Sequence, residues 1–365
     1  MSDQLKKIMI GVAAAFVVLL VVLFLASSCQ KKVSDFSDYR ELMIKAAKAH
    51  FEANEDDLPT EDGKTNEYTL KQMIENNEVD DYVKVFDDES LKCEGTVVVT
   101  NNNGYYLYTS ELDCGETYST KRLKDAIIED NLVETGQGLH EYGNEYVYQG
   151  SNVNNYAKFD NEDYRIISIN EDGDIYIVKQ KSQYYCYWDL HYNEETDGNG
   201  LNVYYREPDK PSTLKDCLED FYTYETYDVN KAYIKTQTVC YGARNSDDTS
   251  KDGSTECSAK YENSPISLLA TYEYLRASTE ENCLNLTSAS CLNYNWIADL
   301  PTTFLITPVA GTADRAYYKR GGIDSTKVQN KYPILAKFKI DGKVDYLSGN
   351  GSIEDPYVIT ETISK

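Results

Sequence analysis

The stretch YRIISINEDGDIYIV, residues 164–178, is the clearest indication of the fold in this chain. Three isoleucines precede the polar segment NEDGD, and two isoleucines follow it. Asn, Asp and Gly favour tight turns, and Gly173 can supply the positive φ that such a turn requires. The stretch therefore predicts two buried antiparallel strands that are joined by a hairpin turn.

The segments around this hairpin predict further short strands and a few helices, which favours an α+β domain over residues 146–365. Helices are expected where Ser/Pro start signals precede an apolar pattern, and strands where short apolar runs lie between turns. The predicted helices are PSTLKDCLEDFY (211–222) and SPISLLATYEYLRAST (264–279); the predicted strands are TTFLITP (302–308), YPILAKFKI (332–340) and the end of GNGSIEDPYVI (349–359).

A smaller module is predicted at residues 34–120. Thr69 and Gln72 in TLKQ form a capping box at the start of a helix, and TVVVTNNNGYYLYTSELDC (96–114) predicts a hairpin with an Asn/Gly turn. Residues 121–145 predict a short helix and then a polar linker. The first helix of the module is predicted from an apolar stripe at Tyr39, Leu42, Ala46, Ala49 and Ala53.

Residues 1–33 are predicted to be a membrane anchor. Residues 8–28 carry no charge and are just long enough to span a bilayer as a helix, with lysines on both sides. The segment Ala26-Ser27-Ser28-Cys29 also resembles a bacterial lipobox, in which the cysteine becomes acylated after cleavage. Two alternatives stay open, a transmembrane helix and a lipoprotein signal with Cys29 as the lipid anchor. Either one makes the membrane a partner through residues 8–28.

Eight further cysteines predict disulfides and an extracellular location, because even cysteine counts at loop-like spacings are typical of oxidising compartments. No CxxC pair and no Cys/His cluster predicts a metal site. Proximity along the chain predicts the pairs Cys93–Cys114, Cys186–Cys217, Cys240–Cys257 and Cys283–Cys291.

The charge and the motifs exclude several classes of function. The formal net charge is −25, so we expect no nucleic-acid partner. The sequence has no phosphate-binding loop and no dinucleotide fingerprint, so we expect no cofactor. The three histidines, His50, His140 and His191, show no pattern of a nucleophile and its base. We therefore expect a protein without catalytic activity.

Two resemblances extend this prediction. The helix, loop, helix and hairpin order of residues 34–120 resembles the globular part of Gram-positive type IV pilin and pseudopilin-like proteins, which implies self-association. The segments YVYQG (146–150), NNYAKF (154–159), YRIISINEDG (164–173), TFLITP (303–308) and DPYVI (355–359) resemble, in order, the signature of uncharacterised surface proteins of low-GC Gram-positive bacteria. That family is similar in layout to C-type-lectin-like and formylglycine-generating-enzyme-like folds.

We therefore predict an adhesion or binding module for a surface glycan or protein, with a pilin-like structural subunit as the alternative. Aromatic side chains that alternate along a strand would face outward in SQYYCYWDLHY (182–192). REPDKP (206–211) resembles the sugar-binding loop of C-type lectins. The Cys240–Cys257 loop would add to this surface, and its DTSKDGSTE segment lacks the final ligand of a calcium loop. The candidate ligand contacts are Tyr184, Tyr185, Tyr187, Trp188, His191, Glu207 and Asp209.

Overall fold

The computed structural model describes residues 35–191 and 211–360, and the hairpin predicted at residues 164–178 is confirmed. Its strands, β7 (Glu162–Ile169) and β8 (Ile175–Lys179), pair antiparallel. Gly173 has a φ of +82°, and its N–H donates to the carbonyl oxygen of Asn170. The register shifts by a bulge within β7. The turn therefore forms for the reason that the sequence suggests.

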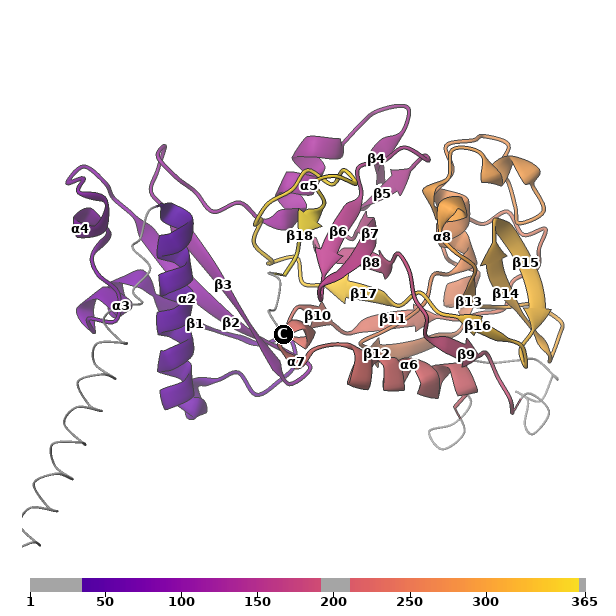
Figure 1. Cartoon of the computed structure of the whole chain (residues 1–365), viewed down its shortest axis with the longest axis horizontal. Helices are drawn as coiled ribbons and strands as arrows, with labels where there is room; N and C mark the ends of the chain where they lie inside the picture. The colour runs from indigo at the N-terminus through magenta and orange to yellow at the C-terminus, as the bar shows by residue number, and fades with distance from the viewer. Residues whose placement is uncertain (1–34, 192–210, 361–365) are drawn as a thin grey trace, which may run out of the picture.

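This hairpin lies in the middle of an eight-stranded sheet, the frame of the larger unit (Figure 1). Six strands follow the order β10-β17-β8-β7-β5-β4, while β6 pairs with β7, and β18 pairs with β6. Only the β6–β18 pair in this sheet is parallel. The remaining strands are β4 (Gly138–Tyr142), β5 (Glu145–Gln149), β6 (Tyr156–Phe159), β10 (Ile234–Lys235), β17 (Lys337–Ile340) and β18 (Tyr357–Val358).

Helices and smaller sheets surround this frame and share one hydrophobic core with it. The helices are α5 (Leu123–Asn131), α6 (Thr213–Glu225), α7 (Asp228–Lys231), α8 (Thr271–Arg276) and the 3₁₀ turns η2 (Glu256–Ser258), η3 (Ala289–Leu292) and η4 (Trp296–Asp299). The smaller sheets pair β9 (Tyr185–Tyr187) with β16 (Lys331–Pro333), β11 (Gln237–Cys240) with β12 (Lys260–Ser264), and β13 (Thr303–Pro308) with β14 (Arg315–Arg320) and β15 (Gly322–Lys327).

The smaller unit consists of one long helix that lies across a three-stranded antiparallel sheet (Figure 1). The predicted capping box at Thr69 is confirmed, and so is the hairpin, whose turn residues Asn103 and Gly104 both have positive φ. A second hydrophobic core lies in this unit. Its elements are α2 (Phe36–Ala53), η1 (Glu55–Asp57), β1 (Thr65–Thr69), α3 (Leu70–Glu75), α4 (Tyr82–Phe86), β2 (Glu94–Asn102) and β3 (Tyr105–Asp113).

Three local predictions were wrong. The buried stripe of α2 passes through Tyr39, Met43, Ala47 and Phe51, because this spacing places the large Met and Phe side chains on the sheet. Residues 138–142 of the expected polar linker form β4. Of residues 264–279, only Thr271–Arg276 are helical, because the preceding chain is extended and the N–H of Ser267 donates to the carbonyl oxygen of Lys337.

The fold class also needs correction. The chain has a mixed α/β fold, in which helices are interspersed among runs of consecutive strands, instead of the predicted α+β fold behind an N-terminal membrane helix. Among the described residues, no helix has both the length and the apolar character that a membrane crossing needs. Residues 1–33, with the predicted anchor and Cys29, lie outside the described residues.

The structure contains the four disulfides that proximity predicted, Cys93–Cys114, Cys186–Cys217, Cys240–Cys257 and Cys283–Cys291. The first lies in the smaller unit and closes its hairpin, while the other three lie in the larger unit. Stable disulfides are characteristic of proteins outside the reducing cytosol. They therefore indicate an extracellular protein.

Candidate functional site

The predicted aromatic surface at residues 184–191 is smaller than expected. Strand β9 buries Cys186, which is disulfide-bonded to Cys217 on α6, while Tyr185 on the other face is 51% exposed. Tyr187 is half-buried, with the ammonium group of Lys331 5.4 Å from its ring centre. The ring of Tyr184 packs edge-on against Phe221 at a centroid distance of 5.2 Å. Of the four aromatic rings at residues 184–188, those of Tyr185 and Tyr187 therefore face outward.

Trp188 was wrongly predicted to face outward, whereas His191 is exposed and stays a candidate ligand contact. Trp188 is fully buried, and its indole N–H donates to the carbonyl oxygen of Leu305 at 3.0 Å, so it is a core residue and not a ligand contact. His191 is exposed, and its backbone N–H donates to Asp189 at 3.0 Å. Glu207 and Asp209 lie outside the described residues.

The polar loop closed by Cys240–Cys257 buries two of its charged side chains, while Asp247 and Asp252 are exposed. Arg244 and Glu256 are both fully buried, and Nη1 of Arg244 donates to both carboxylate oxygens of Glu256 at 2.9 and 3.1 Å. The carboxylates of Asp248 and Asp252 accept turn hydrogen bonds from Ser250 and Ser254, which lowers the pKa of both aspartates. Across residues 35–191 and 211–360, no three His, Cys, Asp or Glu side chains cluster closely enough to hold a metal ion.

Sequence reasoning missed a cavity of about 150 Å³ beneath α8, where charged groups from distant parts of the chain converge. The eight-stranded sheet supplies one wall through β5, β7, β8 and β17, and α8 and η4 supply much of the rest. A cavity of this size accepts a group about as large as benzene. Its polar lining includes Glu145, Ser168, Asn170, Tyr176, Gln237, Tyr272, Glu273, Arg276 and Lys337.

One ion pair in this lining is complete. The ammonium group of Lys337 lies 3.0 and 3.3 Å from the two carboxylate oxygens of Glu273, and the backbone N–H of Ala270 donates to Glu273 at 2.7 Å. The same ammonium group lies 5.4 Å from the ring centre of Tyr176. Both charges are therefore satisfied within the protein and are less available to a ligand.

The guanidinium group of Arg276 is not satisfied in this way. The residue is only 5% exposed, yet its buried Nε and Nη2 atoms have no hydrogen-bond acceptor. Nη2 lies 3.1 Å from Oε2 of Glu145, which is an ion pair without hydrogen-bond geometry. The guanidinium group stacks 4.3 Å from the ring centre of Tyr142. Buried donors without acceptors are costly, so this group favours an incoming acceptor.

The tyrosines of the cavity stay neutral. Burial raises the pKa of the Tyr176 hydroxyl, and the nearby carboxylate of Glu273 raises it further. The same two causes, in the same order, raise the pKa of the Tyr272 hydroxyl. Both side chains therefore present protonated hydroxyl groups and do not add negative charge beside Arg276.

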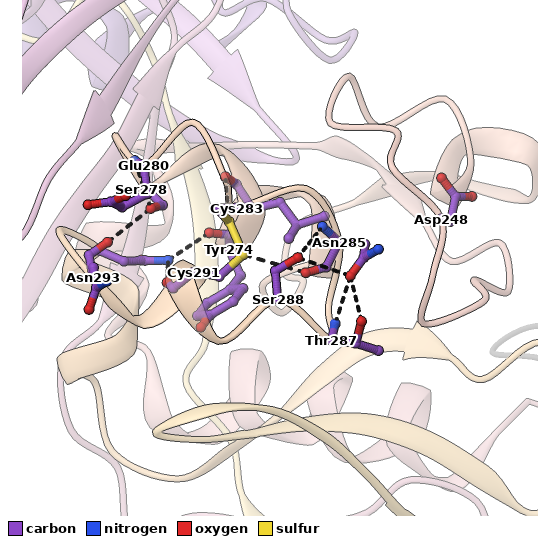
Figure 2. The surroundings of a disulfide bond; sticks show 12 residues. Asp248, Tyr274, Ser278, Glu280, Cys283, Asn285, Thr287, Ser288, Cys291 and Asn293 are labelled. Carbon is purple, nitrogen blue, oxygen red and sulfur yellow. Dashed lines mark hydrogen bonds between the residues drawn. A yellow bond between two sulfur atoms is a disulfide. The ribbon is translucent and has the colours of Figure 1, made fainter.

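Two disulfide loops hold α8, and thus Arg276, in place. At its N-terminal end, the Thr271 hydroxyl and the Tyr272 N–H donate to buried Glu256, which is the last residue inside the Cys240–Cys257 loop. After its C-terminal end, the chain enters the Cys283–Cys291 loop, which lies beside Tyr274 (Figure 2). The amide of Asn295 donates to the carbonyl oxygens of Tyr274 and Cys291, both at 2.9 Å. The loops therefore anchor both ends of the helix.

The other two histidines have structural surroundings. His50 stacks on Tyr68 at a centroid distance of 4.0 Å, and Nε2 of His140 lies 2.9 Å from the carbonyl oxygen of Gly136. Neither lines the cavity at Arg276. In the sequence, TYEYLR (271–276) places Glu273 and Arg276 three residues apart, which predicts that both lie on one face of a helix but does not predict a cavity.

No protein-family model, curated protein or solved structure matches this chain. The resemblances to pilin-like proteins and to Gram-positive surface proteins therefore stay predictions.

Proposed function

We propose that this chain is an extracellular binding protein without catalytic activity, and that its ligand inserts an acceptor group into the cavity at Arg276. The observation that carries this proposal is the buried guanidinium group whose Nε and Nη2 donors lack acceptors. Arginine binds carboxylates and other planar acceptors through two parallel N–H bonds, and such charge-assisted bonds are the strong ones. A small anionic group would satisfy both donors at once.

The chemistry of the lining favours binding over catalysis. Lys337, the other cation of the cavity, is paired with Glu273, and no histidine is among the described residues that line the cavity. The serine and threonine hydroxyls of the lining thus lack the neighbouring histidine that most often activates such a nucleophile. The cavity is concave and has free hydrogen-bond donors on Arg276, and these are the properties of a recognition site.

The test is isothermal titration of the full chain with small carboxylates such as acetate, propionate and benzoate. We expect saturable binding that is lost in Arg276→Met, which keeps an unbranched side chain of similar length without its donors. Arg320→Met removes an exposed arginine from the same unit and is the matched control. If Arg276→Met and Arg320→Met bind the carboxylates with equal affinity, Arg276 does not form the binding site and the proposal fails.

A second part of the proposal concerns attachment of the protein to a membrane. We propose attachment through the N-terminal segment, with acylation of Cys29 as its chemistry, because Ala26-Ser27-Ser28-Cys29 resembles a lipobox. Intact mass spectrometry of membrane-extracted protein tests it, and a mass that includes Met1 and no acyl chain would contradict it.

A structural role through self-association is the second candidate. It is favoured by β1, an edge strand of the three-stranded sheet that has no strand partner on its outer side within the described residues. Exposed edges can pair with another chain. Light scattering of the full chain tests this role, and a monomer at high concentration would exclude it.

A further inference from the structure

A second hollow adjoins the cavity at Arg276 and is strongly acidic, whereas the two carboxylates of the cavity are matched by two cations. It measures about 540 Å³ and lies between α5 and the turns β4–β5 and β7–β8. Glu145 and Asn170 line both hollows, so the two meet at these residues. The two hollows therefore share part of their walls, and we call the second hollow the acidic cleft.

The acidic cleft carries five carboxylates and a single lysine, Lys124. Four of the carboxylates are exposed, while the side chain of Glu145 is 37% exposed and lies between the cleft and Arg276. A concave surface of one sign raises the local concentration of ions of the other sign. The five carboxylates are Asp125, Glu141, Glu145, Glu171 and Asp172.

The two hollows together select a ligand with charges at two positions. Its inner end must be a small acceptor that fits 150 Å³ and reaches Nε and Nη2, which form one side of the guanidinium fork of Arg276. Its outer part must be cationic to lie among the carboxylates of the acidic cleft. Nucleic acids and anionic glycans fail the second condition because the cleft repels them.

We propose that the ligand is the free C-terminus of a basic peptide. The terminal carboxylate replaces Glu145 as the partner of Arg276, and lysine or arginine side chains just before it lie in the acidic cleft. This inference rests on the proposed function, because it names the ligand of the same cavity. Glu145 is the residue that the incoming carboxylate displaces, since its own carboxylate lies 3.1 Å from Nη2 of Arg276.

The experiment is titration of the full chain with three tetrapeptides: acetyl-Lys-Lys-Lys-Gly with a free carboxylate, the same peptide as its C-terminal amide, and acetyl-Glu-Glu-Glu-Gly with a free carboxylate. We expect the lysine acid to bind about tenfold more tightly than its amide, because an ionised acceptor forms the stronger bonds. We expect it to bind more tightly than the glutamate peptide too, with a difference that shrinks as salt rises.

Two variants test whether the cavity at Arg276 causes the preference for the acid and whether the acidic cleft causes the preference for lysine. Arg276→Met should abolish the preference for acid over amide, whereas Glu171→Gln with Asp172→Asn should reduce only the preference for lysine over glutamate. Equal binding of the lysine and glutamate peptides would overturn this inference, and propionate binding that depends on Arg276 would still leave the proposed function standing. If no carboxylate binds, the proposed function fails as well. The comparison of peptides on the unmodified chain decides the question even if a variant does not fold.

Discussion

Replacing Glu256 by alanine should destabilise the larger unit by about 3 kcal/mol. Glu256 is fully buried and accepts from Nη1 of Arg244, from the Thr271 hydroxyl and from the Tyr272 N–H. Its removal leaves Nη1 of the fully buried Arg244 without its carboxylate, although Oδ1 of Asp248 stays 3.4 Å from Nη2. Breaking a buried ion pair by deleting one partner costs about 3–5 kcal/mol. We place this case at the low end, since Nη2 of Arg244 still donates to the carbonyl oxygens of Asp248 and Ser250.

Urea denaturation followed by tryptophan fluorescence measures this loss. Both tryptophans of the chain, Trp188 and Trp296, are buried in the larger unit, so their emission reports on its unfolding. The matched control is Glu354→Ala, an exposed glutamate of the same unit, which should change stability by less than about 0.5 kcal/mol.

The double variant Arg244→Met with Glu256→Met should recover about half of the loss or more, because apolar replacement of both partners of a buried pair is often neutral. Glu256→Ala should also weaken carboxylate binding while the protein is still folded, because the N-terminal end of α8 loses its acceptor. A loss below about 1 kcal/mol, or a double variant as unstable as the single one, would refute this account of the pair.

Three further predictions test other parts of the structure. Lys319 is 1% exposed, and burial lowers its pKa to about 8, so between pH 8 and 10.5 the unfolded chain binds more protons than the folded one. The free energy of unfolding should therefore rise in this range by up to about 1.4 kcal/mol per pH unit. Lys319→Met should remove that slope in urea titrations. Trp188→Ala should cost about 3–5 kcal/mol in the same assay, whereas Tyr185→Ala should cost less than about 0.5, and similar values would contradict their placement in core and surface. Cys240→Ala with Cys257→Ala should cost about 3 kcal/mol and weaken propionate binding, and unchanged calorimetric affinity would show that the loop does not position α8.

Features set by neighbouring residues could be predicted from the sequence. The hairpin at Gly173, the capping box at Thr69 and the disulfide pairs depend on residue types a few to about thirty positions apart. Helix α8 could not be bounded in the same way, because the apolar pattern of residues 264–279 continues through a segment that is extended against β17. The tertiary contact, and not the local pattern, determines where that helix begins.

The candidate site could not be predicted because its charges come from three distant segments. Glu145 belongs to β5, Arg276 to α8 and Lys337 to β17, and only the packing of α8 on the sheet brings them to one cavity. The prediction that Trp188 faces outward was wrong because it relied on the local sequence alone. An aromatic run suggests a contact surface, but the end of β9 turns inward, and the indole N–H finds an acceptor in the core.

The disulfides therefore matter to the site as much as to stability. Helix α8 has six residues, and a helix this short is not stable without external support. That support comes from Glu256 at one end and from Asn295 at the other, and both residues lie next to disulfide-closed loops. A buried guanidinium group whose Nε and Nη2 lack hydrogen-bond acceptors disfavours the folded state, so rigid surroundings are needed to keep it in the cavity. The two loops supply that rigidity, which explains why so polar a part of the chain surrounds the place where a ligand would bind.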